Sequence, residues 1–176
     1  MLLLTKPLGI GVLTTAAKAE LASPEAMALA HRLMTTLNKA ARDCMVRYAV
    51  HACTDVTGFG LLGHAFEMAQ ASDTHLTLFP GEIDLIPEAL ELARDGILPA
   101  GMYRNRHYAE AAVDPGSTEL AVQDMLYDPQ TSGGLLIAAA PEDADALLRE
   151  LRGAVPSAQR IGVVEAYSGG PRISLR

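Results

Sequence analysis

One apolar run, residues 133–140, constrains the fold of this chain more than any other segment. It follows a turn-forming stretch and ends at Pro141-Glu142-Asp143, where a proline and two acids open a helix. An apolar run with such boundaries predicts a buried strand. Further strands are predicted at three places: residues 74–79, 160–166 and 172–175. Since strands and helices alternate without a strict strand–helix–strand rhythm, the pattern predicts an α+β fold, a mixed β-sheet flanked by helices.

Helix signals occur in several segments. The clearest start is Ser23-Pro24-Glu25, with serine at the cap, proline in the first turn and an acid favoured by the helix dipole. The predicted helices cover residues 23–37, 40–50, 58–69, 87–94, 117–126 and 141–153. Apolar residues recur at helical spacing within them, which indicates that each helix packs one face against a core.

Two segments carry weaker signals. Residues 2–15 are apolar, β-compatible and punctuated by glycine, so they are predicted to form a strand kinked near Pro7. Residues 98–116 mix Pro, Gly, Arg and Asn without clear periodicity and are predicted to be a functional loop or an irregular edge. The cations of this second segment, Arg104, Arg106 and His107, could reach an anion, and the open alternative is a solvated loop.

The composition bounds the class of protein. With 176 residues, 49% of them hydrophobic, the chain can bury one substantial core, and we expect a single domain spanning residues 1–176. The formal charge of −7 and the pI near 5.1 argue against nucleic-acid binding, which uses clustered Lys and Arg. No apolar run approaches the roughly 20 residues that cross a bilayer, so no membrane partner is expected. Cys44 and Cys53 lack zinc-ligand spacing, and two cysteines without a secretion signal are typical of a reduced, cytoplasmic protein.

The segment His51–Gly63 places one carboxylate, Asp55, among two threonines and three glycines where an extended segment leads into a helix. The first amides of a helix lack intrahelical partners and attract anions, and glycines let a ligand approach the backbone closely. Asp55 adds a hard oxygen ligand of the kind that joins magnesium to substrate phosphates. The segment therefore indicates a magnesium and phosphate site. The open alternative is structural: Thr57 caps the helix, Asp55 lies in a turn and nothing binds.

Two further groups of polar residues are candidates of lower rank. Residues 128–134 are rich in turn formers, and we favour a structural, hairpin-like bend there over contact with a phosphate. Thr131 and Ser132 are the candidate binding residues of this bend. His51 and His64 bracket the Asp55 motif, but nitrogen ligands suit magnesium poorly, so we interpret both as polar groups bonded at helix ends. Acid–base catalysis by His64 stays open.

Four stretches together resemble one family. In chain order they are Leu2–Gly9 (LLLTKPLG), Thr54–His64 (TDVTGFGLLGH), Pro99–Asn105 (PAGMYRN) and Tyr127–Leu136 (YDPQTSGGLL). Their order and spacing are similar to those of the carboxy-terminal half of selenophosphate synthetase, also called selenide, water dikinase. The third stretch matches loosely, whereas the other three separate this family from its relatives. The resemblance covers nearly the entire chain.

This resemblance implies a fold, a reaction and a set of ligands. The implied fold is the C-terminal domain of the aminoimidazole ribonucleotide synthetase-like superfamily. The implied reaction is the ATP-dependent conversion of selenide to selenophosphate, with release of AMP and orthophosphate and with Mg²⁺ neutralising the phosphates. By residue-wise transfer, Asp55 matches a magnesium ligand, and Thr54, Thr57, Gly58 and Gly60 lie around the phosphates. The implied partners are ATP, selenide, an amino-terminal half and a second copy in a homodimer.

The amino-terminal, ATP-binding half of the family is expected to be absent from this chain. Its glycine-rich segment, its reactive Cys or selenocysteine with the partnering lysine, and its other metal-binding aspartates all precede the point that matches Met1. Cys53 does not take over the role of that cysteine. We therefore expect little or no synthetase activity from the chain alone, because one carboxylate cannot assemble the metal cluster.

Two alternatives stay open at this point. The chain could belong to a related enzyme of the same superfamily, such as aminoimidazole ribonucleotide synthetase or thiamine-monophosphate kinase. Phe59 and the stretch 127–134 favour the selenium branch over these. The chain could also act without catalysis, as a binding or dimer-forming module.

Overall fold

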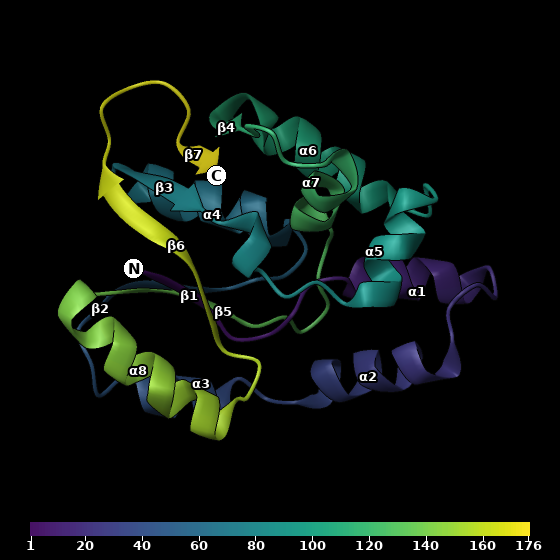
Figure 1. The fold of residues 1–176 in the computed structure, drawn as a ribbon, viewed down its shortest axis with the longest axis horizontal. Coiled ribbons are helices and arrows are strands. Elements are labelled where there is room, and N and C mark those ends of the chain that lie inside the picture. Colours follow the sequence, from purple (N-terminus) through teal and green to yellow (C-terminus); the bar gives the residue numbers. More distant parts are fainter.

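The computed structural model describes residues 1–176 and contains one mixed β-sheet with helices on both faces (Figure 1). The seven strands follow the order β2-β5-β1-β6-β3-β7-β4 across the sheet. Their bounds are β1 Leu2–Leu4, β2 Val50–Asp55, β3 Thr74–Leu78, β4 Val113–Asp114, β5 Leu135–Ala139, β6 Gln159–Ala166 and β7 Ile173–Leu175. The helices are α1 Ile10–Lys18, α2 Pro24–Thr35, α3 Lys39–Met45, α4 Gly60–Ala71, α5 Pro87–Arg94, α6 Ala100–Ala109, α7 Leu120–Tyr127 and α8 Pro141–Ala154, with 3-10 turns η1 Pro80–Glu82 and η2 Glu110–Ala112.

The pairing of the strands makes the sheet mixed. β5 lies between β2 and β1, and both pairs are antiparallel, as are the pairs β1–β6 and β3–β6. Only β7 runs parallel to its neighbours, β3 and β4. β2 therefore forms one edge of the sheet, and the chain that follows it leaves the sheet at that edge. This arrangement confirms the predicted α+β class.

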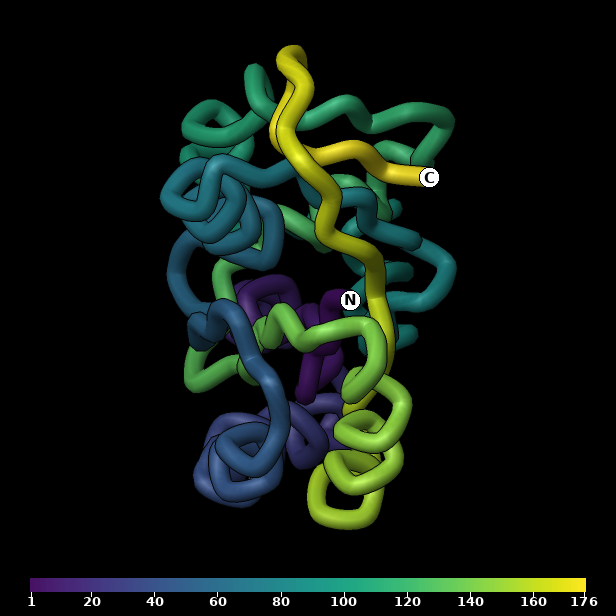
Figure 2. The backbone as a smooth tube through the Cα atoms, turned by 90° about the vertical axis from the view of Figure 1, so that its left-hand side faces the viewer, coloured from purple at the N-terminus to yellow at the C-terminus, as the bar shows by residue number.

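The predicted buried strand, β5, is covered on both faces. Leu135, Ile137 and Ala139 pack with residues of α3 and α8, whereas Leu136 and Ala138 belong to the core that includes α4. Successive side chains of a strand point to opposite faces, so a strand covered on both sides has no polar position. Figure 1 shows α3 and α8 on one side of the sheet and α4, α6 and α7 on the other, and the turned view of Figure 2 shows the same separation.

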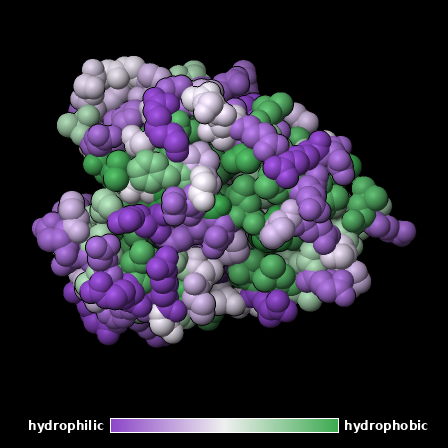
Figure 3. Space-filling model, in the orientation of Figure 1, coloured by the Kyte–Doolittle hydropathy of each residue, from purple (hydrophilic) through white to green (hydrophobic).

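A further group of helices packs beside the sheet. Residues of α1, α2, α5 and α7 form their own core cluster: Ile10, Val12, Leu13, Ala26, Ala30, Ile86, Ala89, Ala93, Ala121 and Met125. On the face shown in Figure 3, apolar side chains gather around this group, whereas the surface over α3 and α8 is mostly hydrophilic. The N-terminus of α1 thereby comes to lie against the chain that follows α7.

The prediction of a kinked strand over residues 2–15 is wrong beyond Leu4, because α1 begins at Ile10. The segment is rich in β-compatible residues, but Ile10, Val12 and Leu13 are buried against α5 and α7. Burial of one helical face outweighs the small differences in local propensity. Gly9, with φ of +129°, makes the turn that precedes the helix.

The prediction of an irregular loop over residues 98–116 is also wrong. This segment contains α6, η2 and the short strand β4. The buried residues of α6 are Met102, Asn105 and Ala109, which recur at helical spacing. A polar residue occupies the middle of the buried stripe, and for that reason the hydrophobic period is not visible in the sequence.

Three helix predictions need new bounds, among them the one over residues 117–126, since α7 runs from Leu120 to Tyr127. α3 ends at Met45 and Val50 already belongs to β2, so the helix predicted over residues 40–50 is wrong in its second half. α4 begins at Gly60 rather than near Gly58, a difference within the usual uncertainty of helix ends. The longest helix, α8, has 14 residues, and no helix of the structure is long and apolar enough to cross a membrane.

Candidate functional site after strand β2

The chain that follows β2 is hydrogen-bonded to the fourth motif stretch, residues 127–136. Val56 is fully buried and donates its backbone N–H to the Gly134 carbonyl at 2.8 Å, which fixes the exit from the strand. The chain then turns outward, and α4 begins at Gly60 with φ of +70°. A side chain at this position would place its Cβ 2.7 Å from the carbonyl of Tyr127. Glycine is therefore required at position 60 by conformation and by packing.

Asp55, the predicted magnesium ligand, is the last residue of the edge strand and its side chain is exposed. It lies opposite Leu135 in the register with β5, and Cys53 lies opposite Ile137. Directly opposed residues point to the same face of a sheet, so both side chains lie on the face of α3 and α8. The Asp55 carboxylate forms no ion pair or hydrogen bond within the chain. It is free to bind a ligand.

Cys53 shares this face with Asp55 and retains contact with solvent. Surrounding atoms nevertheless desolvate the thiol, and this burial, with the charge of Asp55 as a second cause, raises the pKa of Cys53 to about 11. The thiol is therefore protonated at neutral pH and is a poor nucleophile and metal ligand. The structure contains no group of three or more His, Cys, Asp or Glu side chains that could hold a metal. Asp55 alone could contribute one oxygen to a Mg²⁺ ion whose remaining ligands come from water, phosphate or another polypeptide.

Thr54, Thr57 and Gly58 are placed differently from one another. The Thr54 hydroxyl donates to the backbone carbonyl of Asp55 at 3.3 Å, whereas the Thr57 hydroxyl lies 3.1 Å from Nε2 of His64. The N-cap of α4 is Phe59, with no side-chain cap, so the alternative in which Thr57 caps the helix is wrong. At Gly58 a Cβ would meet no atom within 4 Å. The backbone at position 58 is open to an approaching ligand.

An open cavity of about 670 Å³ lies beside this loop. Its lining comes from the loop, α4, α6 and the chain after α7: Thr57, Gly58, Phe59, His64, Gly101, Arg104, Asn105 and Pro129. Arg104 is exposed and is the only Lys or Arg among these residues. Since the whole chain is acidic, with a formal charge of −7, an anion could be attracted here only by local groups such as this guanidinium and the backbone amides.

Arg106 is not available to a ligand in the same way. Its guanidinium donates to Asp124 at 2.6 Å and to Gln123 at 3.2 Å, and it lies 4.8 Å from the centre of the Tyr127 ring. These contacts hold it inside the structure. Burial raises the pKa of Tyr127 to about 12, with the Arg106 charge acting in the opposite direction. His107 is on the surface, 92% exposed, and faces Glu110 at 3.9 Å.

Asn105 is a site residue that sequence reasoning missed. It is 5% exposed, and its amide donates to the carbonyl of Gly58 at 2.8 Å and to that of Tyr127 at 2.9 Å. It thereby ties the open loop to the end of α7. The signal that points to it is the Arg-Asn pair of the loosely matching stretch 99–105, for which the sequence predicts a loop and the structure has a helix.

The loop that follows α7 packs against the loop after β2 and is hydrogen-bonded to it. Asp128 is fully buried, and its Oδ2 accepts the N–H of Gly11 at 2.9 Å. Burial raises the pKa of Asp128 to about 7. Gln130 donates its backbone N–H to the Thr57 carbonyl at 2.9 Å. These bonds are consistent with a structural role of residues 128–134, which stays a prediction, and the loop covers the N-terminus of α1 instead of forming a hairpin.

Lys6 links the first motif stretch to the fourth. Its ammonium group donates to three carbonyls, those of Leu33 and Thr36 at 2.8 Å and that of Ser132 at 2.7 Å. Burial lowers its pKa. Ser132 has φ of +50° and Thr131 is exposed. Neither residue lines the candidate cavity. Their role as binding residues stays a prediction.

His51 is not bonded at a helix end as predicted, because it lies on the exposed side of β2. His64 lies within α4, where its ring contacts Thr57 just before the start of the helix and approaches Glu67 at 3.2 Å. Acid–base catalysis by His64 stays untested.

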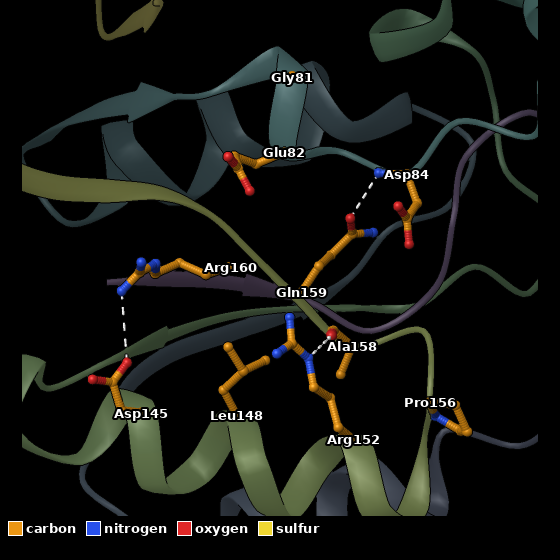
Figure 4. A pocket seen from close by; sticks show the side chains of 10 residues that line it. All are labelled: Gly81, Glu82, Asp84, Asp145, Leu148, Arg152, Pro156, Ala158, Gln159 and Arg160. Carbon is orange, nitrogen blue, oxygen red and sulfur yellow. Dashed lines mark hydrogen bonds and ion pairs between the residues drawn. The ribbon is translucent and has the colours of Figure 1, made fainter.

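A second, polar cleft lies elsewhere on the molecule, between η1, the start of β6 and α8 (Figure 4). It has a volume of about 460 Å³, and charged side chains of both signs face it, including Glu82 and Arg152. None of the predicted site residues lines this cleft. The loop after β2 is the better candidate because it directly follows the unpaired Asp55 carboxylate, and its open backbone at Gly58 shares a cavity with the free cation of Arg104. Asp55 itself lies on the face of α3 and α8 and does not line that cavity.

Comparison with known proteins identifies the family of this fold. Residues 1–172 match the family described as AIR synthase related protein, C-terminal domain. The chain belongs to this family. E. coli HypE, a hydrogenase maturation protein, has a similar fold, with a TM-score of 0.69 and 16% sequence identity over 99% of this chain and 45% of that chain. The predicted membership in the aminoimidazole ribonucleotide synthetase-like superfamily is therefore confirmed.

Among curated proteins, the chain is similar to several named selenide, water dikinase. The protein of that name from Treponema denticola is 44% identical over 151 residues, which are 86% of this chain and 43% of that protein. The one from Caldanaerobacter subterraneus subsp. tengcongensis is 49% identical over 151 residues, 86% of this chain and 44% of that protein. The chain thus spans less than half the length of these relatives. The predicted resemblance to the selenide, water dikinase branch is confirmed.

Proposed function

We propose that this chain is the C-terminal half of a selenide, water dikinase, which uses ATP to convert selenide to selenophosphate. The similarity to proteins of that name supports the branch. The observation that carries the site assignment is that the unpartnered Asp55 carboxylate at the end of β2 is followed, three residues later, by Gly58, which has open space around it. A carboxylate without an internal partner at such a place is available to a metal ion.

In this proposal the loop after β2 receives the polyphosphate of ATP. Asp55 contributes one oxygen to Mg²⁺, which neutralises phosphate charge when it is bound. The open backbone around Gly58 faces the phosphates, and Thr54 and Thr57 flank them. Gly60, which is buried against the Tyr127 carbonyl, shapes the loop rather than contacting the ligand. Arg104, rather than Arg106, supplies the cation, because Arg106 is already paired with Asp124.

The donor set of the chain fits magnesium only as part of a larger site. At the end of β2 the chain supplies one carboxylate, Asp55, and it has no cluster of three potential ligands, whereas Mg²⁺ is octahedral and keeps several waters. We infer that the remaining carboxylates and the selenium-handling groups come from a second structural unit, the amino-terminal half, and that residues 1–172 act as one unit beside it. We also propose that the full-length protein forms a homodimer, largely through its amino-terminal half.

The experiment that tests this function uses the full-length protein that contains this chain. Release of AMP from ATP is measured in the presence and absence of selenide, for the wild type and for Asp55→Asn. The proposal expects selenide-dependent AMP release that Asp55→Asn lowers by about a hundredfold or more, because charge stabilisation of the phosphates is lost. Asp84→Asn, an exposed acid of the other cleft, is the matched control and should keep wild-type turnover. Wild-type turnover in Asp55→Asn would refute the assignment.

A further inference from the structure

Asp128 is the most deeply buried carboxylate of the chain, and it lies beneath the loop after β2 rather than in the cavity. Its Oδ2 accepts hydrogen bonds from the N–H of Gly11 at 2.9 Å and from the amide of Gln130 at 2.8 Å, while Oδ1 has no partner. A side chain at Gly11 would place a Cβ 2.4 Å from Oδ1, so the carboxylate is packed tightly against α1. Burial of such a group is costly unless it is compensated, even at a helix N-terminus.

Gln130 connects this carboxylate to the candidate site. Its side-chain oxygen lies 3.3 Å from the backbone nitrogens of both Gly9 and Ile10, whose N–H groups it accepts. Its side-chain nitrogen donates to Oδ2 and to the backbone carbonyl of Asp128. Every side-chain bond of Gln130 is thus directed to Asp128 or α1, and this leaves its backbone N–H to hold the carbonyl of Thr57 at 2.9 Å.

The backbone of Tyr127 and Asp128 packs against the loop after β2. The Tyr127 carbonyl accepts the same Asn105 amide that donates to Gly58. The backbones of Tyr127 and Asp128 also pass so close to Gly60 that a Cβ there would lie 2.7 Å and 3.1 Å from their carbonyl oxygens. The loop after β2 is therefore held to residues 127–130 at three points: by a hydrogen bond at Thr57, through the Asn105 amide at Gly58, and by close packing at Gly60.

We propose that Asp128 is a positioning residue, which acts through Gln130 to hold the Thr57–Gly60 loop in the shape that receives a nucleoside triphosphate. The nature of the ligand rests on the proposed function, whereas the control of loop shape does not. The carboxylate touches no ligand in this account. It ties the N-terminus of α1, Gln130 and the loop after β2 into one unit, so a change at position 128 is transmitted to Thr57 and to the ring of His64 that contacts it.

The test compares the wild-type chain with Asp128→Asn and Gln130→Met, well below their melting temperatures. Three quantities are measured: the NMR chemical shifts of the His64 ring, the hydrogen-exchange rates of the Gln130 and Gly60 amides, and the dissociation constant of MgATP. In both variants we expect a changed His64 signal, and amide exchange and a MgATP dissociation constant that rise by about tenfold, the effect of losing one hydrogen bond. Asp84→Asn is the control for removal of an acid and should change none of the three.

The possible outcomes separate this inference from the proposed function. Asp128→Asn that folds and leaves the His64 signal and both amide rates unchanged would overturn the positioning role, whatever its MgATP affinity. If the wild-type chain does not bind MgATP, nucleotide binding by the chain alone is refuted while the His64 and amide measurements still decide the positioning role. If Asp128→Asn does not fold, Gln130→Met decides by the same criteria, because it removes the side-chain bonds and keeps the backbone N–H.

Discussion

The loop after β2 and the loop after α7 contact each other, yet they handle polar groups in opposite ways. In the first, the Asp55 carboxylate is exposed without a partner and Gly58 faces open space. In the second, Asp128 is fully buried and Gln130 is 5% exposed with all its side-chain atoms bonded. A polar group can bind a ligand only if it has donor or acceptor atoms without a partner in the protein. A group that stabilises the loop forms its hydrogen bonds within the fold. We call the loop after β2, together with Asp55, the open loop, and residues 128–134 the closed loop. The candidate site is divided between these two loops.

The largest expected effect concerns the charge of the closed loop. The pKa of Asp128 is raised from 3.8 to about 7 in the folded chain, so between these values the folded state holds a proton that the unfolded state has lost. Stability from this group is therefore highest at low pH, falls as pH rises through that window, and is constant above it. Urea unfolding at pH 5 and pH 8 should show this fall as a decreasing free energy of unfolding.

The comparison between the loops depends on assigning that fall to Asp128. The free energies of unfolding of wild type and Asp128→Asn, measured at the same two pH values, should differ in their pH dependence, with a smaller fall from pH 5 to pH 8 in the variant. Identical pH dependence in both proteins would show that the Asp128 carboxylate is not the group that titrates.

The next effect separates two glycines of the open loop. Gly60→Ala should lower the free energy of unfolding by about 3 kcal/mol, because the φ of +70° and the contact with Tyr127 both oppose a side chain. Gly58→Ala should change it by less than about 0.5 kcal/mol, since its Cβ meets no neighbour. Urea unfolding of both variants measures the difference. Equal losses would mean that position 58 is as constrained as position 60.

A smaller effect is expected from the buried ammonium that joins the first motif to the closed loop. Lys6→Met keeps most of the side-chain volume and leaves the three carbonyls of Leu33, Thr36 and Ser132 without their donor. The melting temperature should fall, by an amount that corresponds to a loss of about 2 kcal/mol in the free energy of unfolding. Lys39→Met, which removes an exposed partner of Asp43, is the control and should be close to neutral. A neutral Lys6→Met would show that the carbonyls find water instead.

The smallest effect distinguishes two arginines of α6. Arg104→Gln should leave the melting temperature unchanged and weaken MgATP binding by about fivefold, because it removes the cation of the cavity. Arg106→Gln should do the reverse, with a loss of about 1 kcal/mol of stability from the broken pair with Asp124. Calorimetric titration and thermal unfolding of both variants give the answer. Weaker binding in Arg106→Gln alone would exchange the two roles.

Sequence reasoning was most successful where one kind of signal dominated. The apolar run of β5, the proline-headed helices α5 and α8 and the alternating strand β3 were predicted because their residues face a core with an unmixed pattern. It failed at α6, where the polar Asn105 occupies a buried position, and at α1, where β-compatible residues form a helix. In both cases contacts from distant segments outweighed the local preference.

The sequence by itself determined the family, the α+β class and the identity of Asp55 as the candidate metal ligand, because these depend on residue types in a given order. Only the tertiary structure decided which groups remain free. Arg104 and Arg106 are two residues apart, yet one faces the cavity and the other is held by Asp124. Likewise, Asp55 and Asp128 are both aspartates in motif stretches, but one is exposed and one is buried at the N-terminus of α1. The partner of a polar group is set by chain segments far away in sequence, and its availability is a property of the folded molecule.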